Sequence, residues 1–145
     1  RQNIIITRPF NYTGVDQADH FLIPKIVSHY KDAKKEIDLG NINVFREFND
    51  VSFVVRCYVN LIFSEVRSEI VNVCTGRELN IKSILEIMDD MAGYKMKVNI
   101  NPKFMRNNEI KLLKGSSKKM CSFIGDFIDD YTIKETLTKI FEHKE

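Results

Sequence analysis

The sequence predicts an α/β chain, because short apolar runs typical of strands alternate with segments whose apolar residues recur at helical spacing. With 145 residues, the chain is long enough to enclose a hydrophobic core. Its composition, 43% hydrophobic and 29% charged, is typical of a folded globular protein. No apolar run approaches the roughly 20 residues that a membrane-spanning helix needs, so we expect no membrane span.

The first third of the chain contains three strand candidates and one helix candidate. The β-branched run Ile4–Ile6 stops at Arg8-Pro9 and predicts a strand buried on both faces. A polar loop at 11–19 follows, and apolar residues at helical spacing then predict a helix over 23–30. Short strands are expected at 37–40 and 44–48, separated by a Gly-Asn turn.

Capping residues divide the rest of the chain into further elements. Asp50 is a good N-cap for a helix that extends to Ile62, and a buried strand is expected at 70–74. Asn80 begins a second helix, which Gly93 closes. The last elements are a strand at 97–100, a short helix that ends at Gly125, and a helix that follows a capping box formed by Thr132 and Glu135.

Cysteine usage indicates the redox compartment. Cys57, Cys74 and Cys121 are odd in number and each lies in an apolar stretch, so we expect buried, reduced thiols and a cytoplasmic protein. The three histidines form no cluster with cysteines or carboxylates at metal-ligand spacing, and no metal site is predicted.

Positive charge is concentrated between Lys95 and Lys119. This stretch contains eight Lys or Arg and one acid, Glu109. It is either a solvated basic face or a surface that attracts a phosphorylated ligand, for which Arg106 with Glu109 three residues later is the best candidate. Nucleic-acid phosphate is a third possibility, although aromatic residues suited to stacking are sparse in this stretch.

Tyr30 and Lys34 match the Y-x-x-x-K spacing of the acid/base pair in short-chain dehydrogenases. Tyr30 also completes the apolar stripe of its predicted helix, and no Gly-rich phosphate loop precedes it in these 145 residues. A packing role is therefore the preferred interpretation.

Several motifs in order resemble the extended short-chain dehydrogenase/reductase (NAD-dependent epimerase/dehydratase) family, and among its members the GDP-mannose 4,6-dehydratases and GDP-4-keto-6-deoxy-mannose reductases. Residues 8–14, Arg-Pro-Phe-Asn-Tyr-Thr-Gly, are similar to the family's R-P-F-N-[HY]-T-G. The segments 39–41, 46–51 and 72–77 resemble L-G-N, R-D-F-x-D-V and N-[VI]-[CG]-[ST]-G-R. Glu47 stands where the family usually has Asp, which we expect to be a mild change.

The resemblance implies the C-terminal portion of a Rossmann-type nucleotide-sugar enzyme, comprising the last strands of the parallel sheet and a small α/β substrate-binding domain. Residues 1–19 would end the Rossmann sheet and 20–48 would form a substrate-binding segment. Residues 49–76 would return to the Rossmann layer, and 77–145 would form the C-terminal substrate-binding domain. The glycine fingerprint and the catalytic Tyr and Lys would precede Arg1, so the chain is expected to be a catalytically incomplete part of an NAD(P)-dependent dehydratase or reductase.

The resemblance also implies roles for individual residues. Asn11, Lys25 and Arg46 would bind the phosphates of a GDP-sugar, Arg106 and Glu109 would close over the diphosphate and ribose, and Leu22 would line the base pocket. Pro9 and Phe10 would lie by the nicotinamide of NAD(P), which an upstream domain would mainly bind. A homodimer or homotetramer is expected, with no nucleic-acid or membrane partner. The alternative is a noncatalytic module that binds a phosphate ligand or nucleic acid. The motifs leave dehydratase or reductase, the sugar, and NAD or NADP open.

Overall fold

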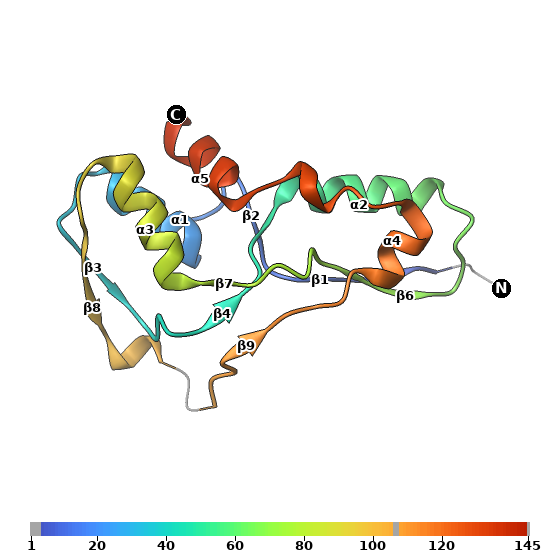
Figure 1. Cartoon of the computed structure of the whole chain (residues 1–145), viewed down its shortest axis with the longest axis horizontal. Helices are drawn as coiled ribbons and strands as arrows, with labels where there is room; N and C mark the ends of the chain where they lie inside the picture. Colours follow the sequence, from blue (N-terminus) through green and yellow to red (C-terminus); the bar gives the residue numbers. More distant parts are fainter. Residues whose placement is uncertain (1–3, 106–107, 145) are drawn as a thin grey trace.

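The computed structural model describes residues 4–105 and 108–144 of the chain. Figure 1 shows an elongated molecule, with its helices gathered at the two ends and over one side of the middle. Two hydrophobic clusters account for this shape, one at each end of the long axis. The α/β class predicted from the sequence is confirmed.

The first cluster is built around a parallel strand pair, β3 (Glu36–Leu39) and β8 (Lys97–Ile100), whose register places Ile37 opposite Val98. Three helices pack together beside this pair: α1 (Leu22–Lys31), α3 (Ile81–Ala92) and α5 (Ile133–Glu142). Their apolar faces meet at fully buried residues such as Ile26 and Ile84.

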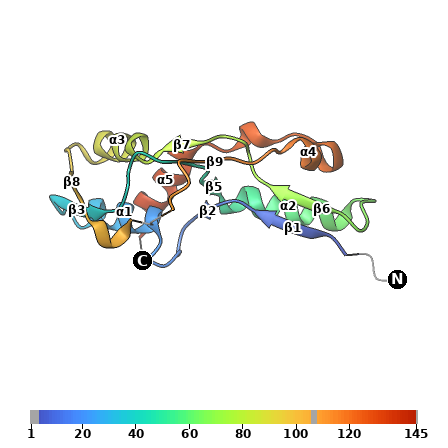
Figure 2. The same ribbon diagram turned by 90° about the horizontal axis from the view of Figure 1, so that it is seen from below.

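The second cluster is built on another parallel pair, β1 (Ile6–Pro9) and β6 (Ile70–Val73). Helices α2 (Val51–Phe63) and α4 (Lys118–Ile124) pack against one face of this pair and bury Phe53 and Val71 completely. Figure 2 shows α2 and α4 beside β1 and β6, away from α1 and α3.

The prediction for the first strand, β1, is wrong in its bounds and in its burial. The strand lies at Ile6–Pro9 rather than 4–6, and it is not buried on both faces, since Ile4 and Ile6 are 57% and 52% exposed. Alternation along a strand sends Ile4 and Ile6 to the face opposite Ile5, and α2 and α4 cover only the face on which Ile5 lies.

Short strands join the two ends. β2 (Tyr12–Thr13) pairs in parallel with β5 (Asn49–Asp50). The central strand β4 (Phe45–Arg46) pairs antiparallel with β7 (Leu79–Asn80) and in parallel with β9 (Leu112–Leu113). Single 3₁₀ turns lie at Pro102–Phe104 and Ile128–Asp130.

The predicted caps are confirmed at three helices. The Asp50 carboxylate accepts a hydrogen bond from Ser52 N, and the Asn80 side chain accepts one from Lys82 N. Thr132 and Glu135 form the reciprocal capping box that begins α5. Gly93 closes α3 in the left-handed region at φ +75°, where glycine is favoured.

Candidate functional site

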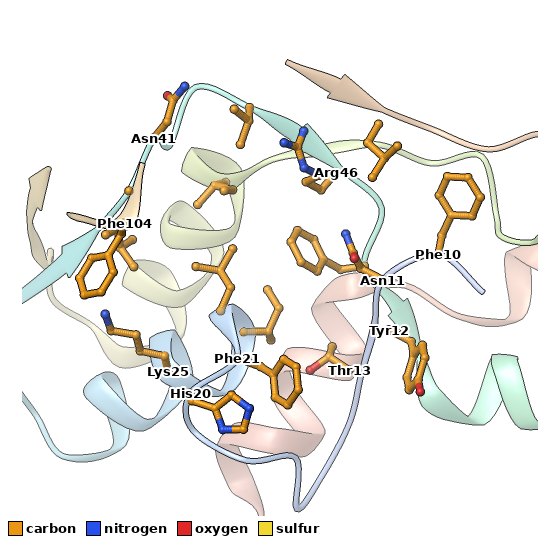
Figure 3. Close-up of a pocket in the computed structure, with 18 of the residues that line it drawn as sticks. Phe10, Asn11, Tyr12, Thr13, His20, Phe21, Lys25, Asn41, Arg46 and Phe104 are labelled. Atoms are coloured by element: carbon orange, nitrogen blue, oxygen red, sulfur yellow. The ribbon is translucent and has the colours of Figure 1, made fainter. Parts of the chain in front are cut away.

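A cleft of about 710 Å³ lies between the two ends of the molecule. It is bordered by the segment that follows β1, the start of α1, the turn after β3, and strands β4 and β9 (Figure 3). Ligand sites in proteins are typically about 300–1,000 Å³, so the cleft has the capacity for a nucleotide-sized molecule.

Seven of the eight site residues predicted from the sequence line this one cleft: Pro9, Phe10, Asn11, Leu22, Lys25, Arg46 and Glu109. They come from segments up to 100 residues apart, and the fold brings them together. The eighth, Arg106, lies outside the described residues. The roles assigned to all eight remain predictions.

Phe10 and Asn11 follow the carboxyl end of β1, which is where parallel α/β sheets place ligand-binding residues. Their backbone is held on both sides. Phe10 N donates to Val73 O at 3.0 Å, and Asn11 O accepts from Asn49 N at 2.9 Å and from the Asn49 side-chain amide at 3.2 Å. These hydrogen bonds hold the backbone from which the Asn11 side chain extends.

Lys25 lies on α1 at the opposite end of the cleft from Phe10 (Figure 3). Its Nζ donates to Asp38 O at 2.6 Å and sits 4.3 Å from the centroid of the Phe104 ring. An ammonium group has three donors, so the bond to Asp38 leaves it able to bind a ligand while its position stays fixed.

Arg46 lies on β4 at the upper wall of the cleft in Figure 3. Its Nη1 donates to two carbonyl oxygens, Phe45 O at 2.8 Å and Lys111 O at 3.4 Å. These bonds anchor one edge of the guanidinium. The other edge of the planar guanidinium can then donate hydrogen bonds to an anion.

Glu109 contributes a carboxylate to the lining of the cleft. Its Oε2 is buried and has no hydrogen-bond partner within the described part of the chain. Buried polar atoms in proteins are nearly always hydrogen-bonded, so an oxygen without a partner among the described residues is a candidate acceptor for a ligand. The cleft is therefore lined by the cationic side chains of Lys25 and Arg46 and by the Glu109 carboxylate.

The cleft also contains aromatic residues that the sequence reasoning did not select. These are Tyr12, His20, Phe21, Phe48 and Phe104. His20 and Phe21 stack with ring centroids 4.2 Å apart. The rings are scattered along the sequence, so no local pattern identifies them as a group.

The lysines of the basic stretch at 95–119 lie outside the cleft, although Phe104, Glu109 and Leu113 of the same stretch line it. Three of its lysines pair with acids elsewhere: Lys97 with Glu36 at 3.1 Å, Lys114 with Glu78 at 2.8 Å and Lys119 with Glu69 at 2.7 Å. No lysine of this stretch lines the cleft described above. Its local charge excess is thus dispersed over the surface.

Tyr30 packs, as expected, instead of lining the cleft. It is 3% exposed, and its hydroxyl donates to Asp89 Oδ1 at 2.6 Å. Burial and the bond to Asp89 raise the pKa of Tyr30 far above its ordinary value. Lys34 forms an ion pair with Asp32 at 3.0 Å instead of facing the phenol. The Y-x-x-x-K match is therefore structural.

Cys57 and Cys74 are buried free thiols, as predicted, whereas the prediction is wrong for Cys121, which lies at the edge of the second cluster and is only half-buried. Burial raises the pKa of Cys57 and of Cys74 to about 12, which makes both poor nucleophiles. Among residues 4–105 and 108–144, no three His, Cys, Asp or Glu side chains are grouped so as to hold a metal ion. Over the same ranges, every helix is too short or too polar to cross a membrane.

Two curated proteins with similar sequences are named for GDP-sugars. A GDP-6-deoxy-D-talose 4-dehydrogenase from Aggregatibacter actinomycetemcomitans is 27% identical over 143 residues, which cover 99% of this chain and 49% of that protein. A GDP-6-deoxy-D-mannose reductase from Pseudomonas aeruginosa is 29% identical over 142 residues, 94% of this chain and 46% of that protein. The chain thus spans about half the length of these relatives.

Solved structures share the fold. A candidate epimerase from Burkholderia cenocepacia superposes with a TM-score of 0.91 at 40% identity, over 95% of this chain and 45% of that one. The structure of RMD from Pseudomonas aeruginosa complexed with NADPH gives 0.83 at 27% identity, over 96% and 47%. This chain is therefore the C-terminal portion of a Rossmann-type fold.

The family model described as GDP-mannose 4,6 dehydratase matches residues 2–140, nearly the whole chain. The two curated relatives are named as a dehydrogenase and a reductase, and this chain matches about half of each. The resemblance seen in the motifs is confirmed: the chain belongs to the GDP-mannose 4,6 dehydratase family.

Proposed function

We propose that the cleft binds a GDP-sugar, and that the chain is the substrate-binding part of an NAD(P)-dependent reductase or dehydratase. The observation that carries the proposal is that one cleft is lined by Lys25, Arg46 and Glu109, whose Oε2 has no hydrogen-bond partner among the described residues. Two cations suit a diphosphate, and a buried acceptor suits a sugar hydroxyl. Both relatives described above are named for GDP-sugars.

The proposal assigns each residue a part of the ligand. Lys25 and Arg46 neutralise the diphosphate, and the Asn11 amide donates to a phosphate oxygen. Glu109 accepts from the ribose, with Arg106 closing over the same region. Leu22, which is half-buried beside the first hydrophobic cluster, forms a wall for the base.

NAD(P) would meet this chain at the carboxyl end of β1. Pro9 and Phe10 line the cleft there, and they offer an apolar surface of the kind against which a nicotinamide ring can lie. The 145 residues contain no G-x-G-x-x-G fingerprint, so the proposal assigns most NAD(P) contacts to a separate dinucleotide-binding part. When bound, NAD(P) supplies hydride transfer, while this chain's residues hold and orient the sugar.

The remaining assignments follow from the resemblance. We infer a cytoplasmic enzyme, with which the three free cysteines agree. Assembly into two or four copies, and the absence of nucleic acid as a partner, belong to the same inference.

Calorimetric titration of the chain with GDP-mannose and with a random DNA oligonucleotide tests the proposal. We expect saturable 1:1 binding of GDP-mannose, and only weak DNA binding that disappears as salt is raised. Absence of GDP-mannose binding, or tighter binding of DNA, would overturn the proposal in favour of a general phosphate-binding module.

A further inference from the structure

Glu47 is a fully buried carboxylate, 0% exposed, that directly follows Arg46 in the chain. Its Oε2 accepts hydrogen bonds from Thr75 N at 3.0 Å and Gly76 N at 3.2 Å, and its Oε1 accepts one from Gly115 N at 2.6 Å. The Thr75 hydroxyl adds a longer bond of 3.5 Å to Oε2. Within the described residues, three backbone amides donate to the Glu47 carboxylate and none of the recorded ion pairs includes it.

Two loops are joined by this side chain. Thr75 and Gly76 follow β6, and Gly115 follows β9, so these donors lie about 40 residues apart in sequence and both loops donate to Glu47. The ion pair between Lys114 and Glu78 also links the two loops, at 2.8 Å. Gly76 adopts φ +73°, and an added Cβ there would lie 3.3 Å from Gly115 O. The two loops are therefore in direct contact at the carboxylate.

The same loops support one end of the cleft. An added Cβ at Gly115 would lie 2.7 Å from Cζ of Phe10. The backbone of Gly115 therefore packs directly against the Phe10 ring and leaves no space for a side chain. Leu113, two residues before Gly115, lines the cleft. Arg46 and Phe48, the neighbours of Glu47, line it as well.

We propose that Glu47 is a positioning residue of the cleft. By holding the Thr75–Gly76 and Gly115 backbones to one carboxylate, it fixes the wall formed by Phe10, Arg46 and Leu113. The link between this wall and a nucleotide rests on the proposed function. The link between Glu47 and the wall does not.

The contacts of the Glu47 side chain with the two loops depend on both its length and its charge. Asp is shorter by one methylene, about 1.5 Å, and cannot reach the loop after β6 and the loop after β9 together at the present spacing. The expectation that Glu in place of Asp is a mild change stays a prediction, and Glu47→Asp tests it. Gln keeps the length but presents an amide NH₂ to donors that need an acceptor.

Glu47→Gln in the 145-residue chain tests the proposal, with Asp89→Asn as the matched control. The Asp89 carboxylate also accepts from a hydroxyl and from a backbone amide, Met96 N at 2.9 Å, and it does not line the cleft. In Glu47→Gln we expect the amide resonances of Phe10 and Leu113 to shift. We also expect at least tenfold faster hydrogen exchange at Gly115 and about tenfold weaker GDP binding, because a displaced wall would weaken the charge-assisted contact that Arg46 makes with the ligand.

In Asp89→Asn the Phe10 and Leu113 amides should stay in place and GDP affinity should change less than about twofold, even if stability falls. Unchanged Gly115 exchange and unchanged cleft amides in folded Glu47→Gln would overturn the proposal. If Glu47→Gln fails to fold, Glu47→Asp serves instead, with exchange expected to rise at one of the two loops. Failure of the wild-type chain to bind GDP would overturn the proposed function only, because the exchange and amide shifts need no ligand.

Discussion

Replacing Arg46 with Ala removes the cation on the upper wall of the cleft. The guanidinium is anchored to Phe45 O and Lys111 O by Nη1, which leaves its other edge for a ligand. A hydrogen bond to a charged group is worth about 1.5–3 kcal/mol, or roughly 10- to 150-fold in affinity. Because Arg46 is only half-buried, solvent screening places the expected loss near the lower end, about 10- to 30-fold in the Kd for GDP.

Calorimetry with GDP measures this loss, and Arg67→Ala is its control. Arg67 also donates from Nη1 to two main-chain carbonyls, Ser64 O at 2.8 Å and Val66 O at 2.7 Å, but it lies away from the cleft. Removal of Arg67 should leave GDP affinity within about twofold of the parent. Equal losses in the two variants would mean that net charge, and no specific contact, attracts the ligand, and the assignment of Arg46 would then fail.

The isolated chain should turn over no GDP-sugar with NAD or NADP, and hydride transfer measured spectrophotometrically would contradict its proposed role. Tyr30→Phe should lose about 1.5–3 kcal/mol of the free energy of unfolding in denaturant titrations, because it removes a bond to the Asp89 carboxylate; a similar fall in GDP affinity would show that Tyr30 also serves the site. Arg106→Ala in the intact enzyme should weaken GDP-sugar binding about 10- to 150-fold and leave NAD(P) affinity nearly unchanged. Burial alone would raise the pKa of Asp50, but hydrogen bonds from Ser52 and Thr136 and the nearby Lys139 outweigh it and lower that pKa. Stability from Asp50 should therefore be present above the ordinary carboxyl pKa of about 4 and be lost as pH falls below it, and Asp50→Asn should flatten this part of the stability-versus-pH curve.

Helix ends could be predicted from the sequence because they depend on neighbours in the chain. Asp50, Asn80 and the Thr132–Glu135 box act within three residues, and each caps its helix as expected. The two-residue strands β5, β7 and β9 could not be predicted, since each exists only through pairing with a distant segment.

The site was predicted in part for a related reason. Family motifs indicate Asn11, Lys25 and Arg46 as site residues, but they do not reveal that the Glu47 side chain is buried. A carboxylate between Arg46 and Phe48 in a short strand is typical of an exposed position. Its burial follows from backbone amides at Thr75 and Gly115, whose approach the sequence does not reveal.

Amide chemical-shift mapping of the ¹⁵N-labelled chain with GDP-mannose tests the central claim most directly, because it shows both whether the ligand binds and where. The account predicts that saturating ligand shifts the amides of Asn11, Lys25, Arg46 and Leu113 most, all of which belong to the cleft. Amides on the outer face of α2, such as Val59, should not move. Shifts confined to the dispersed lysines around Lys118, or no shifts at saturating GDP-mannose, would contradict it.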